Sequence, residues 1–330
     1  MNRMLWIAVS AFAFATSAGV AISQEKKTLA IVVKGLDNPF FTVLGDGCAK
    51  WNEENGASEY ECVYTGPASS SDEAGEVQLV QELIAQGAAG VAISPSNAPA
   101  MAEMLRAQSP EMPIVTIDAD LLPADRDLRS VYLGTDNYDM GARMAEHLKS
   151  IRPDGGMLCL QLGNVAAANI NERAAGFRDT ISAEKGLGRL NGEGGWTEID
   201  GCPLYTNDDT NTAVQQFADV SGVNPDLNAF VLVGGWAQFD AETYAAACEQ
   251  LKPRLESNEL VIVAGDLLPP QVDALKAGCS HVQVGQRPFE IGHDAPDVLI
   301  RLINGETVED PIHIELDECT QENADSCVQG

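Results

Sequence analysis

The chain has 330 residues, which is enough for two domains because single hydrophobic cores seldom grow beyond about 250–300 residues. Its formal charge is −29, from 49 acidic and 20 basic residues. Nucleic acids and anionic membranes carry the same sign of charge and would be repelled, so we expect neither as a partner.

Residues 1–23 have the pattern of a signal peptide. A short basic start precedes an apolar run over residues 4–21, and small residues at 21–23 suit cleavage. A membrane anchor is the alternative, since the run approaches a membrane-spanning length, but its polar residues and its cleavage site favour removal. The first cysteine is Cys48, so no thiol for lipid attachment stands near the cleavage site. We expect an exported, soluble mature chain.

After this leader, short apolar and β-branched runs alternate with longer segments of helical periodicity. This order is typical of parallel sheets with helices on both faces. Ten strands fit two sheets of about five strands better than one large sheet. The expected strands cover residues 29–33, 62–64, 90–94, 114–117 and 131–134 in a first set, and residues 157–162, 197–200, 230–233, 260–264 and 282–284 in a second set.

Helices are expected between these strands. Residues 41–51 and 76–86 each carry apolar side chains every three or four residues, which indicates one buried face. A third helical stretch covers residues 169–178. Helix starts are expected at residues that cap well, namely Asp72, Asn97, Asn137 and Asp209.

The eight cysteines of this exported chain indicate disulfides, because their number is even and no pair has the C-x-x-C spacing. Cys319 and Cys327 could close a small loop, and Cys48 with Cys62 could tie a helix to the next strand. Cys159 lies in an apolar run, where a buried free thiol is equally compatible. Spacing leaves the pairing open for Cys202, Cys248 and Cys279.

Ligands of open parallel sheets lie outside the carboxyl ends of the strands, so the residues that follow each strand are candidates for binding. Asn38, Phe40 and Phe41 follow the first strand, where Pro39 holds Asn38 extended and suits a helix start. Aromatic rings can cover the apolar faces of a sugar while amides bind its hydroxyls. The alternative is that both rings belong to the core, and only Phe41 fits the helical stripe.

Asp118 and Asp120 follow the fourth strand, and alternation would put them on one side of the sheet if the strand continued. Such a pair could accept hydrogen bonds from sugar hydroxyls, or perform acid–base catalysis as in a glycosidase. Two solvated loop acids are the third interpretation. Their position at a strand end favours binding over catalysis.

The second set of strands is also followed by polar residues. Arg173, near the start of its helix, could direct guanidinium donors into a cleft, with a surface ion pair as the alternative. Trp236, Asp266 and Gln286 follow the third, fourth and fifth strands of this set. Because both sets contribute, we expect one ligand to be held between two lobes.

Common catalytic motifs are missing from the sequence. It contains no G-x-S-x-G, P-loop or H-E-x-x-H, and no G-x-G-x-x-G after a predicted strand. The sequence therefore predicts a binding protein, not an enzyme, with neither a metal nor a cofactor. Its four histidines lack ligand-like spacing; they are His147, His281, His293 and His313.

Four short segments carry a family resemblance by their order and spacing. They resemble the ribose-binding family of periplasmic sugar-binding proteins, whose core also forms the ligand domain of LacI-type repressors. The resemblance runs from about residue 27 to residue 316. A repressor would need a helix-turn-helix where the predicted leader stands. The segments are Asn38-Pro39-Phe40-Phe41, Gly134-Thr135-Asp136-Asn137, Glu172-Arg173-Ala174-Ala175-Gly176-Phe177 and Gln286-Arg287-Pro288.

The resemblance implies the type I periplasmic binding fold, which is α/β with two doubly wound parallel-sheet lobes joined by a three-segment hinge. The hinge crossings fall near Thr135, Gln286 and Ile314. Lobe 1 is then expected at residues 24–135 plus 287–314, with a helix over 288–304. Lobe 2 is expected at residues 136–286 plus 315–330.

The resemblance also implies the ligand contacts. Phe40 and Phe41 would sandwich the sugar ring, while Asp118, Arg173 and Asp266 would hold its hydroxyls. Asp120 and Trp236 are further candidates from the strand-end argument alone. The full set implied by the resemblance is Asn38, Phe40, Phe41, Asp118, Arg173, Asp266 and Gln286.

Two departures from the family pattern bear on the ligand. Ribose-binding members carry Arg beside the first-lobe Asp, where this chain has Ala119, and Asn-Asp where it has Gly234-Gly235. We therefore expect another pentose, a hexose, a polyol or a small sugar derivative instead of ribose.

The implied function is that of a periplasmic monomer that closes over a monosaccharide or sugar-like ligand and delivers it to the membrane permease of an ABC importer. A sugar receptor for a membrane sensor or a chemotaxis protein is the alternative.

Overall fold

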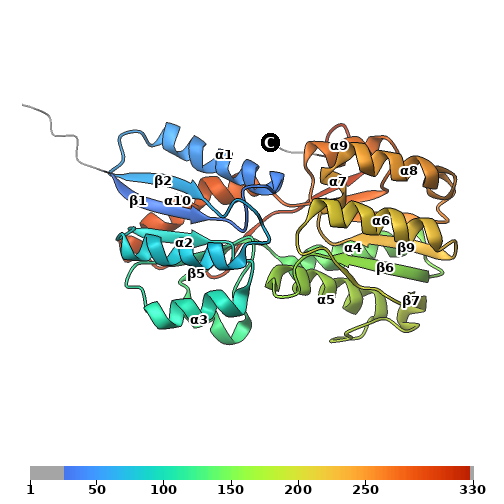
Figure 1. Ribbon diagram of the computed structural model, residues 1–330, viewed down its shortest axis with the longest axis horizontal. Coiled ribbons are helices and arrows are strands. Elements are labelled where there is room, and N and C mark those ends of the chain that lie inside the picture. Colours follow the sequence, from blue (N-terminus) through green and yellow to red (C-terminus); the bar gives the residue numbers. More distant parts are fainter. Residues whose placement is uncertain (1–25, 328–330) are drawn as a thin grey trace, which may run out of the picture.

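The computed structural model describes residues 26–327, which form two α/β halves lying side by side (Figure 1). The first half contains the N-terminal elements and one late helix, α10, which is coloured orange-red among blue and teal neighbours. The second half contains the middle of the chain. The predicted leader, residues 1–23, lies outside the described residues.

The first half is built on a six-stranded parallel sheet in the order β12-β5-β4-β3-β1-β2. Its central strands are buried on both faces, which explains why their sequences are continuous apolar runs. Helices α1 and α10 pack on one face, and α2 and α3 pack on the other. The bounds are β1 Lys27–Val32, α1 Pro39–Glu54, β2 Tyr60–Thr65, α2 Glu73–Ala85, β3 Gly90–Ile93, α3 Ala98–Gln108, β4 Ile114–Ile117, η1 Pro123–Leu128, β5 Val131–Thr135, α10 Pro288–Ile303 and β12 Ile312–Ile314.

The second half is built on a seven-stranded sheet in the order β13-β11-β10-β9-β6-β7, with β8 also paired to β6. Only β13 is antiparallel to its neighbour. The bounds are α4 Asn137–Ile151, β6 Gly156–Leu162, α5 Ala168–Ser182, η2 Glu193–Gly195, β7 Trp196–Glu198, β8 Leu204–Tyr205, α6 Thr210–Val223, β9 Leu227–Leu232, α7 Trp236–Phe239, α8 Ala241–Glu256, β10 Val261–Gly265, α9 Pro269–Lys276, β11 Val282–Gly285 and β13 Asp317–Thr320.

All ten predicted strands overlap strands of the structure. Three further strands, β8, β12 and β13, were not predicted because they are two to four residues long and partly exposed, so no apolar run marks them. The sheets therefore have six and seven strands, not about five each.

Three of the four predicted helix starts are confirmed as N-caps, at Asp72, Asn97 and Asp209. The prediction for α4 is wrong by one residue. Asp136 caps this helix by accepting a hydrogen bond from the backbone N–H of Asp139 at 3.0 Å, and Asn137 is the first helical residue. The side chain of Asn137 is thereby free for another contact.

The chain passes between the two sheets three times, from β5 to α4, from β11 to α10 and from β12 to β13. Two helix pairs flank these crossings and touch through glycines. In the α1–α10 pair, a Cβ at Gly47 of α1 would collide with the backbone of α10, and a Cβ at Gly292 of α10 would collide with the backbone of α1. In the α4–α5 pair, a Cβ at Gly141 of α4 would collide with the backbone of α5, and a Cβ at Gly176 of α5 would collide with the backbone of α4. These glycines allow backbones to approach more closely than any side chain permits.

Four disulfides lie within the described residues, and none of them joins one sheet to the other. Two match the suggested pairings, Cys48–Cys62 and Cys319–Cys327. The free-thiol interpretation of Cys159 is wrong, because the chain before β8 returns beside β6 and brings Cys202 to it. The fourth bridge is Cys248–Cys279. Each half is therefore cross-linked internally, while the crossings carry no disulfide.

The helices of residues 26–327 include none that combines the length and the apolar character needed to cross a bilayer.

Removing the Cys248–Cys279 bridge by serine substitutions should lower the free energy of unfolding by about 3–4 kcal/mol, because it closes a loop with a separation of 31 residues. Removing Cys319–Cys327, with a separation of 8, should cost only about 2.5 kcal/mol. Urea unfolding of the two double variants measures both losses. Equal losses would contradict the loop-closure argument.

Candidate ligand-binding site

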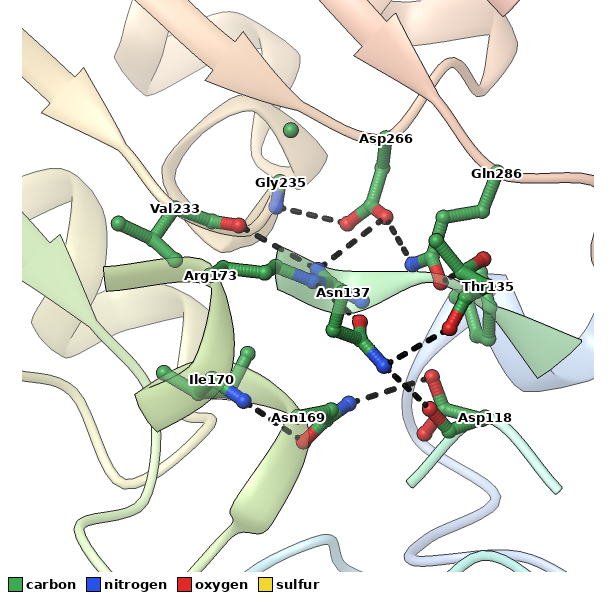
Figure 2. Close-up of polar contacts among 12 residues, drawn as sticks. Asp118, Thr135, Asn137, Asn169, Ile170, Arg173, Val233, Gly235, Asp266 and Gln286 are labelled. Atoms are coloured by element: carbon green, nitrogen blue, oxygen red, sulfur yellow. Dashed lines mark hydrogen bonds and ion pairs between the residues drawn. The ribbon is translucent and has the colours of Figure 1, made fainter. Parts of the chain in front are cut away.

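The two sheets meet at a network of buried polar side chains, drawn in Figure 2. Asp118 follows β4 of the first sheet. Asp266 and Gln286 follow β10 and β11 of the second sheet, and Arg173 extends from α5. All four residues are at most 7% exposed. The structure thus brings together four predicted site residues that lie far apart in the sequence.

Asp118 is held by residues from both halves. Its Oδ2 accepts a hydrogen bond from the Ser94 hydroxyl at 2.7 Å and lies 3.2 Å from the Lys34 ammonium. Its Oδ1 accepts a hydrogen bond from Asn169 of the second half at 3.4 Å. Lys34 also donates to Asn169 at 3.3 Å. A buried carboxylate needs such partners, because leaving it unpaired costs several kcal/mol.

Asp266 is the matching carboxylate of the second half. It accepts hydrogen bonds from the backbone N–H of Gly235 at 2.9 Å and from Gln286 Nε2 at 2.7 Å. Gln286 in turn accepts from the Thr135 hydroxyl at 2.8 Å, at the first crossing between the sheets. The network therefore runs from one half into the connecting segment.

Arg173 lies in the middle of the network, and one of its guanidinium nitrogens forms no hydrogen bond within residues 26–327. Nε donates to Asn137 at 2.8 Å, and Nη1 donates to the Val233 carbonyl at 3.3 Å and lies 4.0 Å from Asp266 Oδ1. Nη2 is buried and has no hydrogen-bond partner within residues 26–327. An unsatisfied buried donor is costly, so Arg173 Nη2 is a candidate donor to a ligand acceptor.

The close packing of α4 against α5 fixes the position of Arg173. A Cβ at Gly141 of α4 would collide with the backbone carbonyl of Arg173, so only glycine fits there. This contact brings Asn137, at the start of α4, within hydrogen-bond distance of the guanidinium.

Asp120 does not join the network. The strand ends at Ile117 and Asp118 takes a left-handed conformation with φ 57°, so the strand does not continue to Asp120 and the alternation argument fails. Its carboxylate instead accepts two hydrogen bonds from Arg129 at 2.9 Å and one from Thr116 at 2.6 Å. Burial raises the pKa of Asp120, but these hydrogen bonds outweigh it and hold the pKa below its usual value. Asp120 thus stabilises the loop after β4.

The predicted aromatic sandwich is wrong. The rings of Phe40 and Phe41 meet edge to face, with centroids 5.2 Å apart and planes at 85°, so no sugar ring can lie between them. Both rings belong to the core of the first half and are 4% and 2% exposed. Asn38 caps α1 by accepting a hydrogen bond from the Phe40 N–H at 2.9 Å.

Trp236 starts α7 and is 6% exposed. Its ring covers Gly163 and Gly234, where a Cβ would lie 2.6 Å from ring carbons. These glycines follow β6 and β9, so the indole lies at the carboxyl edge of the second sheet, as expected from its position in the sequence.

Three residues of this region were missing from the prediction. Lys34 directly follows the residues of the first strand, so the strand-end rule could have found it. Asn169 lies in a predicted helical stretch, where periodicity does not distinguish it from its neighbours. Asp208 follows β8, a two-residue strand that has no sequence signal.

The arrangement offers hydrogen-bond donors and acceptors but no metal site. Within the part of the chain that the structure describes, no group of three or more His, Cys, Asp or Glu side chains could hold a metal ion. Donors and acceptors at the ends of strands from two sheets suit a ligand rich in hydroxyl groups.

Fold and site together define a two-lobed α/β binding protein. The chain belongs to the periplasmic binding protein domain family, whose model matches residues 29–307. The resemblance inferred from the sequence and the type I fold are thereby confirmed.

Curated relatives cover nearly the whole chain. The ribose import binding protein of Haemophilus influenzae is 26% identical over 317 residues, covering 93% of this chain and 97% of the relative. That of Escherichia coli is 25% identical, with 95% and 98% covered.

Solved structures show the same fold. A solute-binding protein of Agrobacterium vitis with bound D-fucose superposes with a TM-score of 0.77 at 22% identity, covering 91% of this chain and 97% of that one. One from Burkholderia graminis with D-arabinose has a TM-score of 0.77 at 24% identity, covering 93% and 100%.

Glu76, close to this site, should make stability depend on pH. It is fully buried, and burial raises its pKa to about 7 against the hydrogen bonds from Ser96 that lower it. The folded-state pKa of Glu76 lies above the ordinary 4.5. The contribution of its protonated form to the free energy of unfolding is therefore intact below pH 4.5 and is lost as pH rises to about 7.

Replacing Glu76 with glutamine removes this titration. Between pH 4.5 and 8 the wild type should lose roughly 3 kcal/mol relative to E76Q, measured by urea unfolding at each pH. Parallel pH profiles of the two proteins would show that Glu76 titrates normally.

Proposed function

We propose that this protein captures a monosaccharide or polyol between its two halves and delivers it to the membrane permease of an ABC importer. The observation that carries the proposal is the buried network in which Asp118, Arg173, Asp266 and Gln286 meet from both sheets. Its free guanidinium nitrogen, Arg173 Nη2, supplies a donor for a ligand oxygen.

The relatives support a hydroxylated ligand. The two solved structures contain D-fucose and D-arabinose, and the full-length curated relatives are ribose import proteins. All of these ligands are monosaccharides, so carboxylate and guanidinium side chains would take hydroxyl groups here as well.

We propose that the lobes are residues 24–135 plus 287–314 and residues 136–286 plus 315–330, and that they close over the ligand by bending at the three crossings. Contacts between the halves describe the closed form. Arg126 donates to Glu172 at 3.0 Å, Asn164 donates to Glu73, and the Ala98 N–H donates to the Ala166 carbonyl at 3.4 Å. A ligand that bridges both halves shifts the equilibrium toward this form.

In this proposal the protein acts in the periplasm as a monomer and performs no catalysis. Asp118, the candidate acid of a glycosidase, has a close ammonium partner and two further hydrogen bonds. In this arrangement the carboxylate already accepts hydrogen bonds from side chains of both halves. We propose that the first-half wall of the cleft is formed by three residues, Asn38, Phe40 and Phe41.

Asp118 and Asp120 allow a matched test. Asp118→Asn should weaken the best ligand from a thermal-shift screen of pentoses, hexoses and polyols by about 2 kcal/mol, roughly thirtyfold. Asp120→Asn is the same chemical change two residues away, and it should leave the affinity within threefold while lowering the melting temperature. Calorimetric titration measures both affinities. Equal effects of the two substitutions on affinity would refute the proposed site.

A further inference from the structure

Asp208 is a buried carboxylate that the network described above does not use. It lies in the loop after β8, is 7% exposed and has a left-handed backbone with φ 62°. Oδ1 accepts a hydrogen bond from the backbone N–H of Asn164 at 3.1 Å. Oδ2 accepts no hydrogen bond within residues 26–327, and it is not fully buried.

Asp208 lies close to the boundary between the halves. Its carboxylate and the Trp236 ring lie side by side above Gly163, where a Cβ would collide with both. Asn164, to which it is bonded, reaches across to Glu73 of the first half. The charges that act on Asp208 come from both halves, namely Lys34, Asp118 and Arg173.

The charges in this cleft do not balance. Lys34 forms an ion pair with Asp118, and Arg173 lies 4.0 Å from Asp266. Asp208 has no ion-pair partner among the described residues, so two cations face three carboxylates. A buried carboxylate without a counter-charge is destabilising. Burial accordingly raises the pKa of Asp208 to about 6, against the lowering effect of Lys34.

We propose that Asp208 binds the ligand directly and that the ligand is a hydroxylated molecule carrying a protonated amine, such as an amino sugar. The ammonium supplies the missing positive charge and a hydrogen bond to the free Oδ2, while the hydroxyl groups occupy the Asp118, Arg173 and Asp266 side of the cleft. This inference rests on the proposed function and narrows its ligand class.

Matched sugar pairs test the proposal. The probes are D-glucose with D-glucosamine, D-galactose with D-galactosamine, and D-mannose with D-mannosamine, titrated calorimetrically at pH 7. At least one amino sugar should bind the wild type ten or more times as tightly as its neutral partner. In Asp208→Asn this preference should fall below threefold, because the amide keeps the Asn164 contact and tolerates the left-handed backbone but carries no charge.

Asp219→Asn is the control, since Asp219 is an exposed acid on α6, and it should keep the full preference. Preference for the neutral sugars, or an amino-sugar preference that survives in Asp208→Asn, overturns the proposal and leaves sugar capture standing. Binding of none of the six probes, nor of any pentose or polyol in the screen, overturns both.

The pH dependence gives a second readout with a defined sign. Ionised Asp208 holds the ammonium, so affinity for the amino sugar should rise about tenfold from pH 5 to pH 7 and fall again above about pH 8, where the amine of the ligand loses its proton. Asp208→Asn should abolish the rise, whereas E76Q, which removes the other buried carboxyl with a raised pKa, should keep it. Affinity that falls over this range would mean that the protonated form of Asp208 binds the amino sugar better than the ionised form, which contradicts the proposal.

Discussion

The structure depends on buried charges that one half alone does not satisfy. Asp118 belongs to the first half, yet one of its oxygens accepts a hydrogen bond from Asn169 of the second half. Lys34 likewise donates to Asn169 across the cleft. Because buried ionised groups need counter-charges and hydrogen bonds, these residues favour closure, and a ligand that offers better partners favours it further.

Three buried aspartates near the site share an unusual backbone conformation. Asp118, Asp208 and Asp266 all adopt left-handed conformations directly after or near strand ends, with φ of 57°, 62° and 69°. This conformation is uncommon outside glycine but is tolerated by Asp. It turns the chain out of the extended conformation after the strand. Similar outliers concentrate at binding sites, where the surrounding structure sustains the strain.

The disulfides and the closest helix contacts each lie within one half of the structure. The four disulfides and the glycine contacts of α1 with α10 and of α4 with α5 stiffen the two bodies. The three crossings carry only single strands of chain. Two compact bodies joined by a few connecting segments suit hinge closure, in which a few residues absorb the change in dihedral angles.

The sequence predicted the central strands from runs of buried β-branched residues, and it predicted Asp118, Asp266 and Gln286 because they follow strands. Arg173 was predicted from its place near the start of a helix. It could not predict the partners of Asp120, since Arg129 reaches it through tertiary packing. The perpendicular packing of Phe40 and Phe41 is likewise invisible to periodicity. Asp208 was missed because β8 is held by its pairing with β6, not by its own apolar pattern.

The most direct test of this account is a crystal structure of the protein with its captured ligand. We predict ligand oxygens within hydrogen-bond distance of both the Asp118 carboxylate and Arg173 Nη2, with the halves closed around them. A ligand bound to one half only, or a ligand in the neighbouring cavity that contacts Asp120, Arg129 and His313 but neither Asp118 nor Arg173, would contradict the account.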